Sequence, residues 1–65
     1  MDDLITVKEA ADICHASPET VRYWHYAGKG PTSFKVGRRR LYKRADVLAW
    51  LEGQYKLAQT QAASL

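Results

Sequence analysis

The apolar positions near the start of the chain follow the period of a helix. Four small or apolar residues recur at intervals of three and four: Val7, Ala10, Ala11 and Cys14. This spacing predicts a helix from Val7 to about Cys14 with one face turned inward. Thr6 precedes the helix and Glu9 follows three residues later, which is the pattern of a capping box. Ile5, just before the cap, is placed to pack against Ala10.

A second helix is predicted only three residues later. Ser17 suits the N-cap, and Pro18 suits the first helical position, where its missing N–H costs nothing. Three residues share the inner face: Val21, Trp24 and His25. Gly28 follows as a left-handed cap that ends the helix. A connection this short does not suit an antiparallel helix pair, and its length fits a helix-turn-helix.

The chain after Gly30-Pro31 predicts a β-hairpin. Residues 33–36 and 40–43 alternate apolar and polar side chains around Gly37-Arg38, which is a hairpin signal. Three side chains are expected to face inward: Phe34, Val36 and Tyr42. Because a two-stranded hairpin is not stable alone, we expect it to pack against the helices.

A third helix is predicted from about Arg44, with Asp46 in its first turn. Its inner face completes the expected core of Val21, Trp24, Phe34, Val47, Trp50 and Leu51. Beyond Gly53 the helical character weakens, and residues 62–65 are expected to fray. The fold class is therefore mostly α with a small β-hairpin, in the order α-α-β-β-α. We expect one domain over residues 1–53 and a weakly helical or frayed tail over residues 54–65.

Composition excludes several classes of protein. At 65 residues the chain has room for one small domain, and 46% hydrophobic with 26% charged residues is ordinary for a folded protein. No apolar run approaches the roughly 20 residues that span a membrane, and the acidic start Met1-Asp2-Asp3 is unlike a secretory signal, so we expect a cytoplasmic protein. A single cysteine, Cys14, excludes an internal disulfide, and together with His15 and His25 it falls short of a metal site. No catalytic set is present, so we expect neither an enzyme nor a cofactor.

Charge is separated along the chain, although the net charge is only +3. Seven of the ten Lys and Arg residues lie between Lys29 and Arg44, a segment without Asp or Glu. The rest of the chain holds three basic residues and all seven acidic residues. One interpretation is a solvated basic loop. The other is a phosphate-binding surface, where clustered cations release the counterions of a nucleic acid.

Helix, tight turn, helix, basic hairpin and helix are the elements of a winged helix-turn-helix. In that arrangement the second helix enters the major groove of DNA, and the hairpin, called the wing, lies along the backbone or in the minor groove. Arginine suits the wing because it grips phosphate through two N–H groups and enters a narrow, negatively charged groove.

Motifs over residues 4–52 resemble the MerR-like winged-helix domains of phage excisionases and AlpA-type regulators. They are Glu9-Ala10-Ala11, residues 17–24, Gly28-Lys29-Gly30-Pro31, residues 35–39 with Tyr42, and residues 46–51. The resemblance implies a protein that binds and bends attachment-site DNA, so that a phage integrase excises the prophage in the bacterial host. Full-length MerR regulators carry a long dimerisation helix and an effector domain. We expect neither here, and this departure argues against a metal or drug sensor.

The nine residues that we expect to contact DNA lie on the second helix and the wing. They are Ser17, Glu19, Thr20, Arg22, Tyr23, Lys35, Arg38, Arg39 and Arg40. Alternatives remain for two of them: Arg22 could pair with Glu19 on the surface, and Glu19 could serve only the positive end of its helix. Ser17 is first a helix cap, and its hydroxyl is also placed near a phosphate. Tyr26 is expected either to flank the groove or to cover the edge of the core.

Two other functions stay open. A small AlpA-type transcriptional regulator shares the same chemistry, whereas a protein-recruitment module without DNA contact leaves the arginines of the wing unexplained. For an excisionase the expected partners are double-stranded DNA with direct repeats and the integrase. We expect a monomer in solution that binds cooperatively, copy beside copy, on the DNA.

Overall fold

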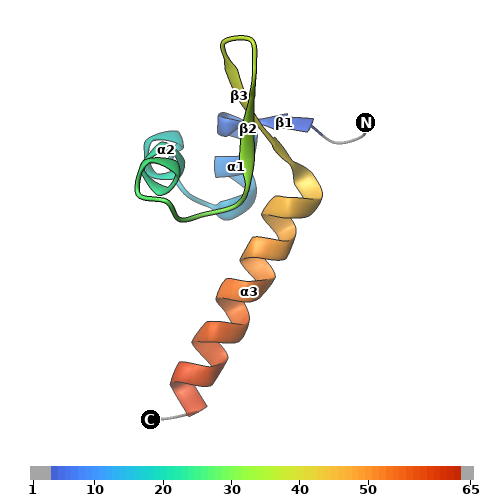
Figure 1. The fold of residues 1–65 in the computed structure, drawn as a ribbon. Helices are drawn as coiled ribbons and strands as arrows, with labels where there is room; N and C mark the ends of the chain where they lie inside the picture. The colour runs from blue at the N-terminus through green and yellow to red at the C-terminus, as the bar shows by residue number, and fades with distance from the viewer. Residues whose placement is uncertain (1–3, 64–65) are drawn as a thin grey trace.

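The computed structural model describes the backbone of residues 4–63 and the side chains of residues 4–60. Its elements in chain order are β1 (Leu4–Thr6), α1 (Val7–Cys14), α2 (Pro18–Tyr26), β2 (Ser33–Val36), β3 (Arg39–Lys43) and α3 (Arg44–Ala63). Figure 1 shows α1, α2 and the strands gathered in one body, from which α3 projects. The domain is small and mostly helical, and the predicted order of three helices and a hairpin is confirmed.

The sheet has one strand more than the hairpin that the sequence predicts. Strand β3 lies between β1 and β2, and both neighbours pair with it in antiparallel register. Ile5 faces Tyr42 on one side of β3, and Phe34 faces Leu41 on the other. The predicted hairpin is therefore present as β2 and β3, and β1, which was not predicted, extends it to three strands. Strand β1 is three residues long, too short for alternation to mark it, and its partner lies far along the chain.

Both connections around α2 are closed by the same hydrogen-bonded cap. After α2, the N–H of Lys29 donates to the carbonyl of Trp24 at 2.8 Å, and Gly28 has a left-handed φ of 75°. After α1, the N–H of Ala16 donates to the carbonyl of Ala11 at 2.9 Å, and here His15 takes the left-handed conformation. The cap at His15 makes the turn between α1 and α2 tight, as predicted.

The core differs in composition from the predicted one, because Tyr42 and Ile5 are its largest buried side chains. The buried residues are Ile5, Ala10, Ala11, Val21, Tyr42 and Val47. Predicted burial is confirmed for Val21 and Val47, whereas Phe34, Trp24, Trp50 and Leu51 are only partly buried. The rings of Trp24 and Trp50 pack against each other at 4.8 Å between centroids. Two positions expected to face inward are exposed: Val36, which lies near the end of the hairpin, and His25.

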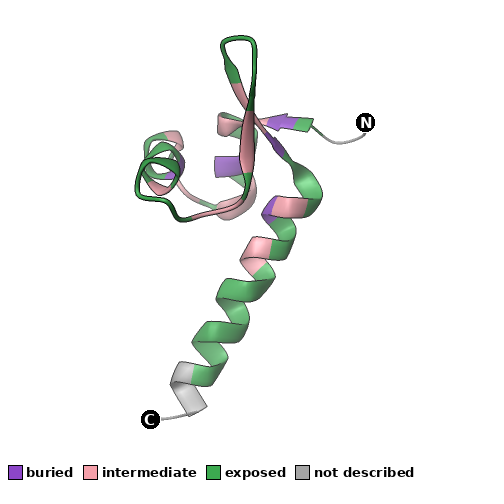
Figure 2. Ribbon diagram, in the orientation of Figure 1, coloured by how far each residue is buried: buried purple, intermediate pink, exposed green. Residues whose placement is uncertain are grey.

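Helix α3 leaves the body after its second turn. Val47 is buried and Trp50 and Leu51 are partly buried, but every residue from 52 to 60 is exposed (Figure 2). The helix continues through Gly53, so the predicted boundary between residues 53 and 54 falls inside one continuous helix. Residues 64 and 65, part of the segment expected to fray, lie outside the described residues. None of the helices in residues 4–63 has the length and apolar character needed to cross a membrane.

Candidate nucleic-acid interface

Helix α2 turns one face away from the body. Its buried residue is Val21, which packs in the core with Trp24 beside it. Four of the residues expected to contact DNA are exposed on the remaining surface of the helix: Glu19, Thr20, Arg22 and Tyr23. The exposed face thus presents one cation, one carboxylate, one hydroxyl and one phenol, which are the groups that contact base edges and phosphates.

The first turn of α2 is held by Ser17. Its hydroxyl oxygen accepts the backbone N–H of Thr20 at 3.1 Å, which confirms Ser17 as the N-cap. The hydroxyls of Ser17 and Thr20 lie 2.9 Å apart and share a further hydrogen bond. Because both hydroxyls belong to the cap, this end of α2 is rigid and its exposed side chains start from fixed positions.

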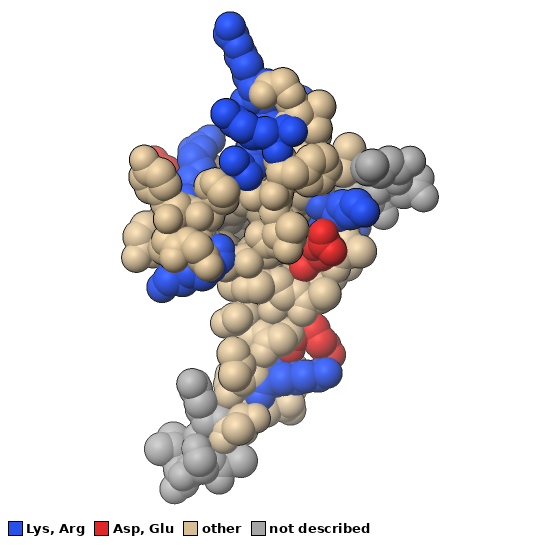
Figure 3. Space-filling model, in the orientation of Figure 1, with Lys and Arg blue, Asp and Glu red and all other residues tan. Residues whose placement is uncertain are grey.

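The wing, which consists of β2, β3 and the turn at Gly37 and Arg38, carries five of the ten basic residues. Gly37 has a φ of 61°, the left-handed conformation that this two-residue turn requires. Lys35, Arg38 and Arg39 are exposed. Figure 3 shows basic side chains gathered around the wing, at the upper end of the molecule. The wing therefore places a group of cations at one end of the fold.

Arg40 differs from the other arginines of the wing. It is partly buried, and its Nη1 donates a hydrogen bond of 2.8 Å to the hydroxyl oxygen of Ser33 on β2. Arg40 is therefore held against β2, whereas Arg38 and Arg39 are exposed. Successive side chains of a strand point to opposite faces of the sheet, so Arg39 and Arg40 lie on different faces. Arg40 lies on the same face as the buried Tyr42, which is the face nearer the body.

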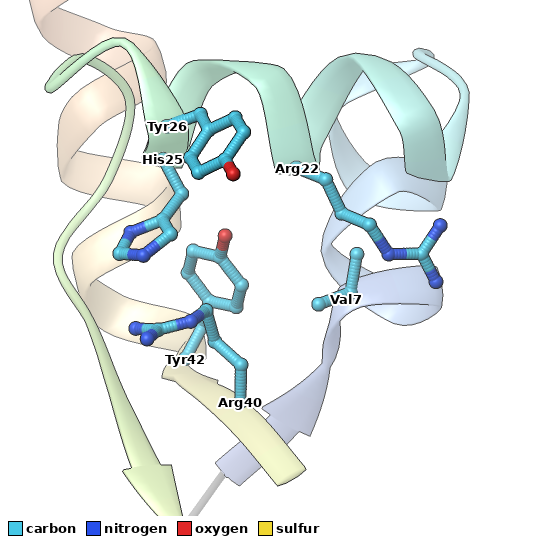
Figure 4. A pocket seen from close by; sticks show the side chains of 6 residues that line it. All are labelled: Val7, Arg22, His25, Tyr26, Arg40 and Tyr42. Carbon is cyan, nitrogen blue, oxygen red and sulfur yellow. The ribbon is translucent and has the colours of Figure 1, made fainter.

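Two hollows bring α2, the wing and the start of α1 together. The first, of about 350 Å³, is lined by Val7, Arg22, His25, Tyr26, Arg40 and Tyr42 (Figure 4). The second, of about 480 Å³, is lined by Thr6, Val7, Lys8, Arg22, Arg38, Arg39 and Arg40. Both hollows include Arg22 from α2 and Arg40 from the wing. The fold therefore joins the two elements that the sequence predicts as DNA contacts into one basic surface.

Five of the predicted residues do not line these hollows, and two basic residues outside the predicted set also have notable positions. Ser17, Glu19, Thr20, Tyr23 and Lys35 line neither hollow. Lys8 lines the second hollow, but a lysine in the first turn of a helix carries no signal of its own in the sequence. Lys29 places its ammonium 5.8 Å from the centre of the Tyr23 ring, and its position in the basic segment was the available signal.

Three titratable groups have shifted pKa values. The N–H of Thr6 donates to the Glu9 carboxylate at 2.9 Å, and this hydrogen bond lowers the pKa of Glu9. Burial raises the pKa of the Tyr42 phenol, which a hydrogen bond with Ser33 and the charge of Arg40 partly oppose. Burial also raises the pKa of the Cys14 thiol, so this cysteine is protonated at neutral pH. Within the described part of the chain, no three His, Cys, Asp or Glu side chains gather as a metal site would need.

A comparison with protein families matches residues 4–55 to the helix-turn-helix domain. The match begins at β1 and ends in α3, so it includes the whole body of the fold and both hollows. No curated protein and no solved structure gives a significant match to the chain.

Proposed function

The chain belongs to the helix-turn-helix domain family, and from this premise we propose that it is an excisionase, a DNA-binding protein that directs an integrase toward excision. Membership of the family implies DNA binding, and such domains are typically not enzymes. The excisionase role adds that the chain binds and bends attachment-site DNA next to the integrase, in the cytoplasm of the bacterial host.

One observation carries the proposed mode of binding: Arg22 and Arg40 line the same two hollows, although they come from α2 and β3. A duplex placed against this surface meets α2 in its major groove and the wing on the neighbouring backbone or minor groove. The proposed contacts are Ser17, Glu19, Thr20, Arg22, Tyr23, Lys35, Arg38, Arg39 and Arg40. Of these, Glu19 and Arg22 would read base edges or hold the helix in register, and the cations of the wing would bind phosphates.

A second candidate function is a small transcriptional regulator. It is favoured by apolar side chains that α3 exposes, since Leu48 is 50% exposed and Tyr55 62% exposed. These two residues are seven apart and therefore lie on one face of the helix, where a second copy could pack. A dimer of that kind binds an inverted repeat, as regulators commonly do.

The deciding experiment is an excision assay. Linear DNA carrying the attachment sites is incubated with the purified integrase of the same element, with and without this chain. An excisionase raises the yield of excised circles and lowers the yield of the reverse reaction. If recombination in both directions is unchanged while the chain still binds DNA upstream of a promoter, the regulator is the correct function.

A further inference from the structure

The hollow between α2 and β3 has an apolar floor and cations at its sides. We call it the backbone seat, defined by Val7, Arg22, His25, Tyr26, Arg40 and Tyr42. Figure 4 shows the phenol rings of Tyr26 and Tyr42 entering from opposite walls with their hydroxyls turned toward each other. The methyl groups of Val7 lie beside them, and the guanidinium groups of Arg22 and Arg40 extend to opposite sides.

The cation on the β3 side is held in place. Arg40 is partly buried and donates to Ser33 at 2.8 Å, so its guanidinium does not sample the wide space that an exposed arginine does. A guanidinium has five N–H donors, and one bond to Ser33 leaves others for a ligand. A cation that is already oriented loses less conformational entropy when it binds, which makes this arginine a stronger ligand than one at the tip.

The arrangement specifies the chemistry of its ligand. A small free anion needs the guanidinium groups but not the apolar floor between them. A neutral apolar molecule would use the floor and leave both cations without a partner. The backbone of DNA alternates an apolar deoxyribose with an anionic phosphate, and a phosphate lies on each side of every internal sugar.

We propose that the backbone seat holds one deoxyribose of a DNA strand against Val7 and the exposed ring of Tyr26, while Arg22 and Arg40 bind the two phosphates that flank this sugar. The inference rests on the proposed DNA binding and assigns a particular piece of the backbone to a particular hollow. The second hollow shares Val7, Arg22 and Arg40 with the seat and adds Lys8, Arg38 and Arg39. The same strand therefore continues over a cationic surface toward the tip of the wing.

The first test measures how many phosphates the two arginines neutralise. Dissociation constants for a 20-base-pair duplex of mixed sequence are measured by fluorescence anisotropy at several salt concentrations. We expect Arg22→Ala and Arg40→Ala each to weaken binding about tenfold and to reduce the salt slope by about 1. Because the two arginines bind different phosphates, the double variant should bind about a hundredfold more weakly, and its salt slope should fall by about 2. Lys56→Ala, at an exposed position of α3, is the matched control and should stay within about twofold of the wild type.

Ser33→Ala tests whether Arg40 is positioned. It should weaken binding about threefold in the wild-type background and have little effect in the Arg40→Ala background, where the only bond of Ser33 left to lose is the one to the buried Tyr42. An equal loss in both backgrounds would show that Ser33 has a separate role. Circular dichroism of every variant establishes that the fold is kept.

The second test observes the sugar directly. In a complex of methyl-labelled protein with the same duplex, the Val7 methyl groups should give nuclear Overhauser effects to deoxyribose H4′ and H5′ protons, and the Leu57 methyl groups on α3 should give none. Nuclear Overhauser effects to base protons alone, or unchanged salt slopes in both arginine variants, would contradict the proposed backbone seat. Either result would leave the proposal of DNA binding intact. If the wild type does not bind the duplex at all, the proposed function fails as well.

Discussion

At the scale of single residues, the sharpest feature is a left-handed backbone at a residue other than glycine. His15 has a φ of 55° and ends α1, and its N–H donates to the carbonyl of Asp12 at 3.3 Å. This conformation costs a residue with a Cβ about 1–2 kcal/mol relative to glycine. Glycine also gains entropy in the unfolded chain, which offsets part of that difference.

We therefore predict that His15→Gly stabilises the protein by about 0.5–1 kcal/mol and raises its melting temperature by a few degrees. Asp12→Gly is the matched control, because residue 12 is exposed inside α1, where glycine costs about 1 kcal/mol. Thermal unfolding followed by circular dichroism measures both variants. Equal destabilisation by the two glycines would contradict the strain assigned to His15.

The lowered pKa of Glu9 gives a second prediction. The carboxylate accepts the N–H of Thr6, so its pKa in the folded protein lies below the unfolded value of about 4.3. A carboxyl group with a depressed pKa contributes stability above the unfolded value, and this contribution is lost as pH falls through the folded value. Glu9→Gln keeps an acceptor for the same N–H but cannot titrate. Between pH 5 and pH 3 the variant should lose less stability in urea unfolding than the wild type, and a parallel loss in both proteins would contradict the assignment.

At the scale of elements, the sequence predicts those helix ends and turns that neighbouring residues specify. Ser17 and Pro18 mark the start of α2, and Gly37 marks the turn of the wing, because caps and turns depend on neighbouring residues alone. Strand β1 could not be predicted, since its pairing with β3 is decided by residues about 37 positions away. The bond from Arg40 to Ser33 likewise depends on how β2 and β3 pair, although alternation along the strand already separates Arg40 from Arg39.

The length of α3 was missed for another physical reason. Its second half lies away from the body, so no apolar face is buried there to give a periodic pattern. Residues such as Gln, Ala, Leu and Lys have good helix propensity without such a face. Helix propensity alone is weaker evidence than an apolar periodicity, so the sequence beyond Gly53 predicts only a weakly helical segment.

We predict that Gly53→Pro ends α3 without unfolding the body. Proline removes the N–H that bonds to the preceding turn and clashes with its carbonyl, so the helix should stop before residue 53. Residues 52–60 are all exposed, and the core lies before them. The helical ellipticity should fall while the melting temperature of the body changes by only a few degrees. Gly53→Ala, whose Cβ meets nothing within 4 Å, is the control and should raise the ellipticity.

At the scale of the whole molecule, the basic wing and the exposed part of α3 lie at opposite ends of the long axis. The basic wing lies at one end and the exposed half of α3 at the other, and the longest dimension is 45 Å (Figure 1, Figure 3). Leu48 and Tyr55 are two half-exposed side chains on α3, and two side chains alone bury much less than the roughly 1,000 Å² of a stable interface. Contacts between copies should therefore be too weak to hold a dimer in free solution.

Sedimentation of the free chain should accordingly give the mass of a monomer. On attachment-site DNA with direct repeats, band shifts should show stepwise complexes, and the affinity for each further copy should rise if neighbouring copies touch. Leu48→Ser with Tyr55→Ser should keep the first shift and weaken the cooperativity if α3 makes that contact. A stable dimer that shifts one inverted repeat in a single step would instead support the regulator.

The salt dependence of DNA binding tests the central claim, which is that α2 and the wing form one surface for the DNA backbone. The dissociation constant for a short duplex is measured between about 50 and 200 mM salt for the wild type and for the triple variant Arg38→Ala, Arg39→Ala, Arg40→Ala. For the wild type, the logarithm of the binding constant should fall against the logarithm of salt with a slope of about −4, because four or five phosphates are neutralised. The triple variant should fold normally, bind far more weakly and have a much shallower slope. A folded triple variant with the affinity and slope of the wild type would contradict this account.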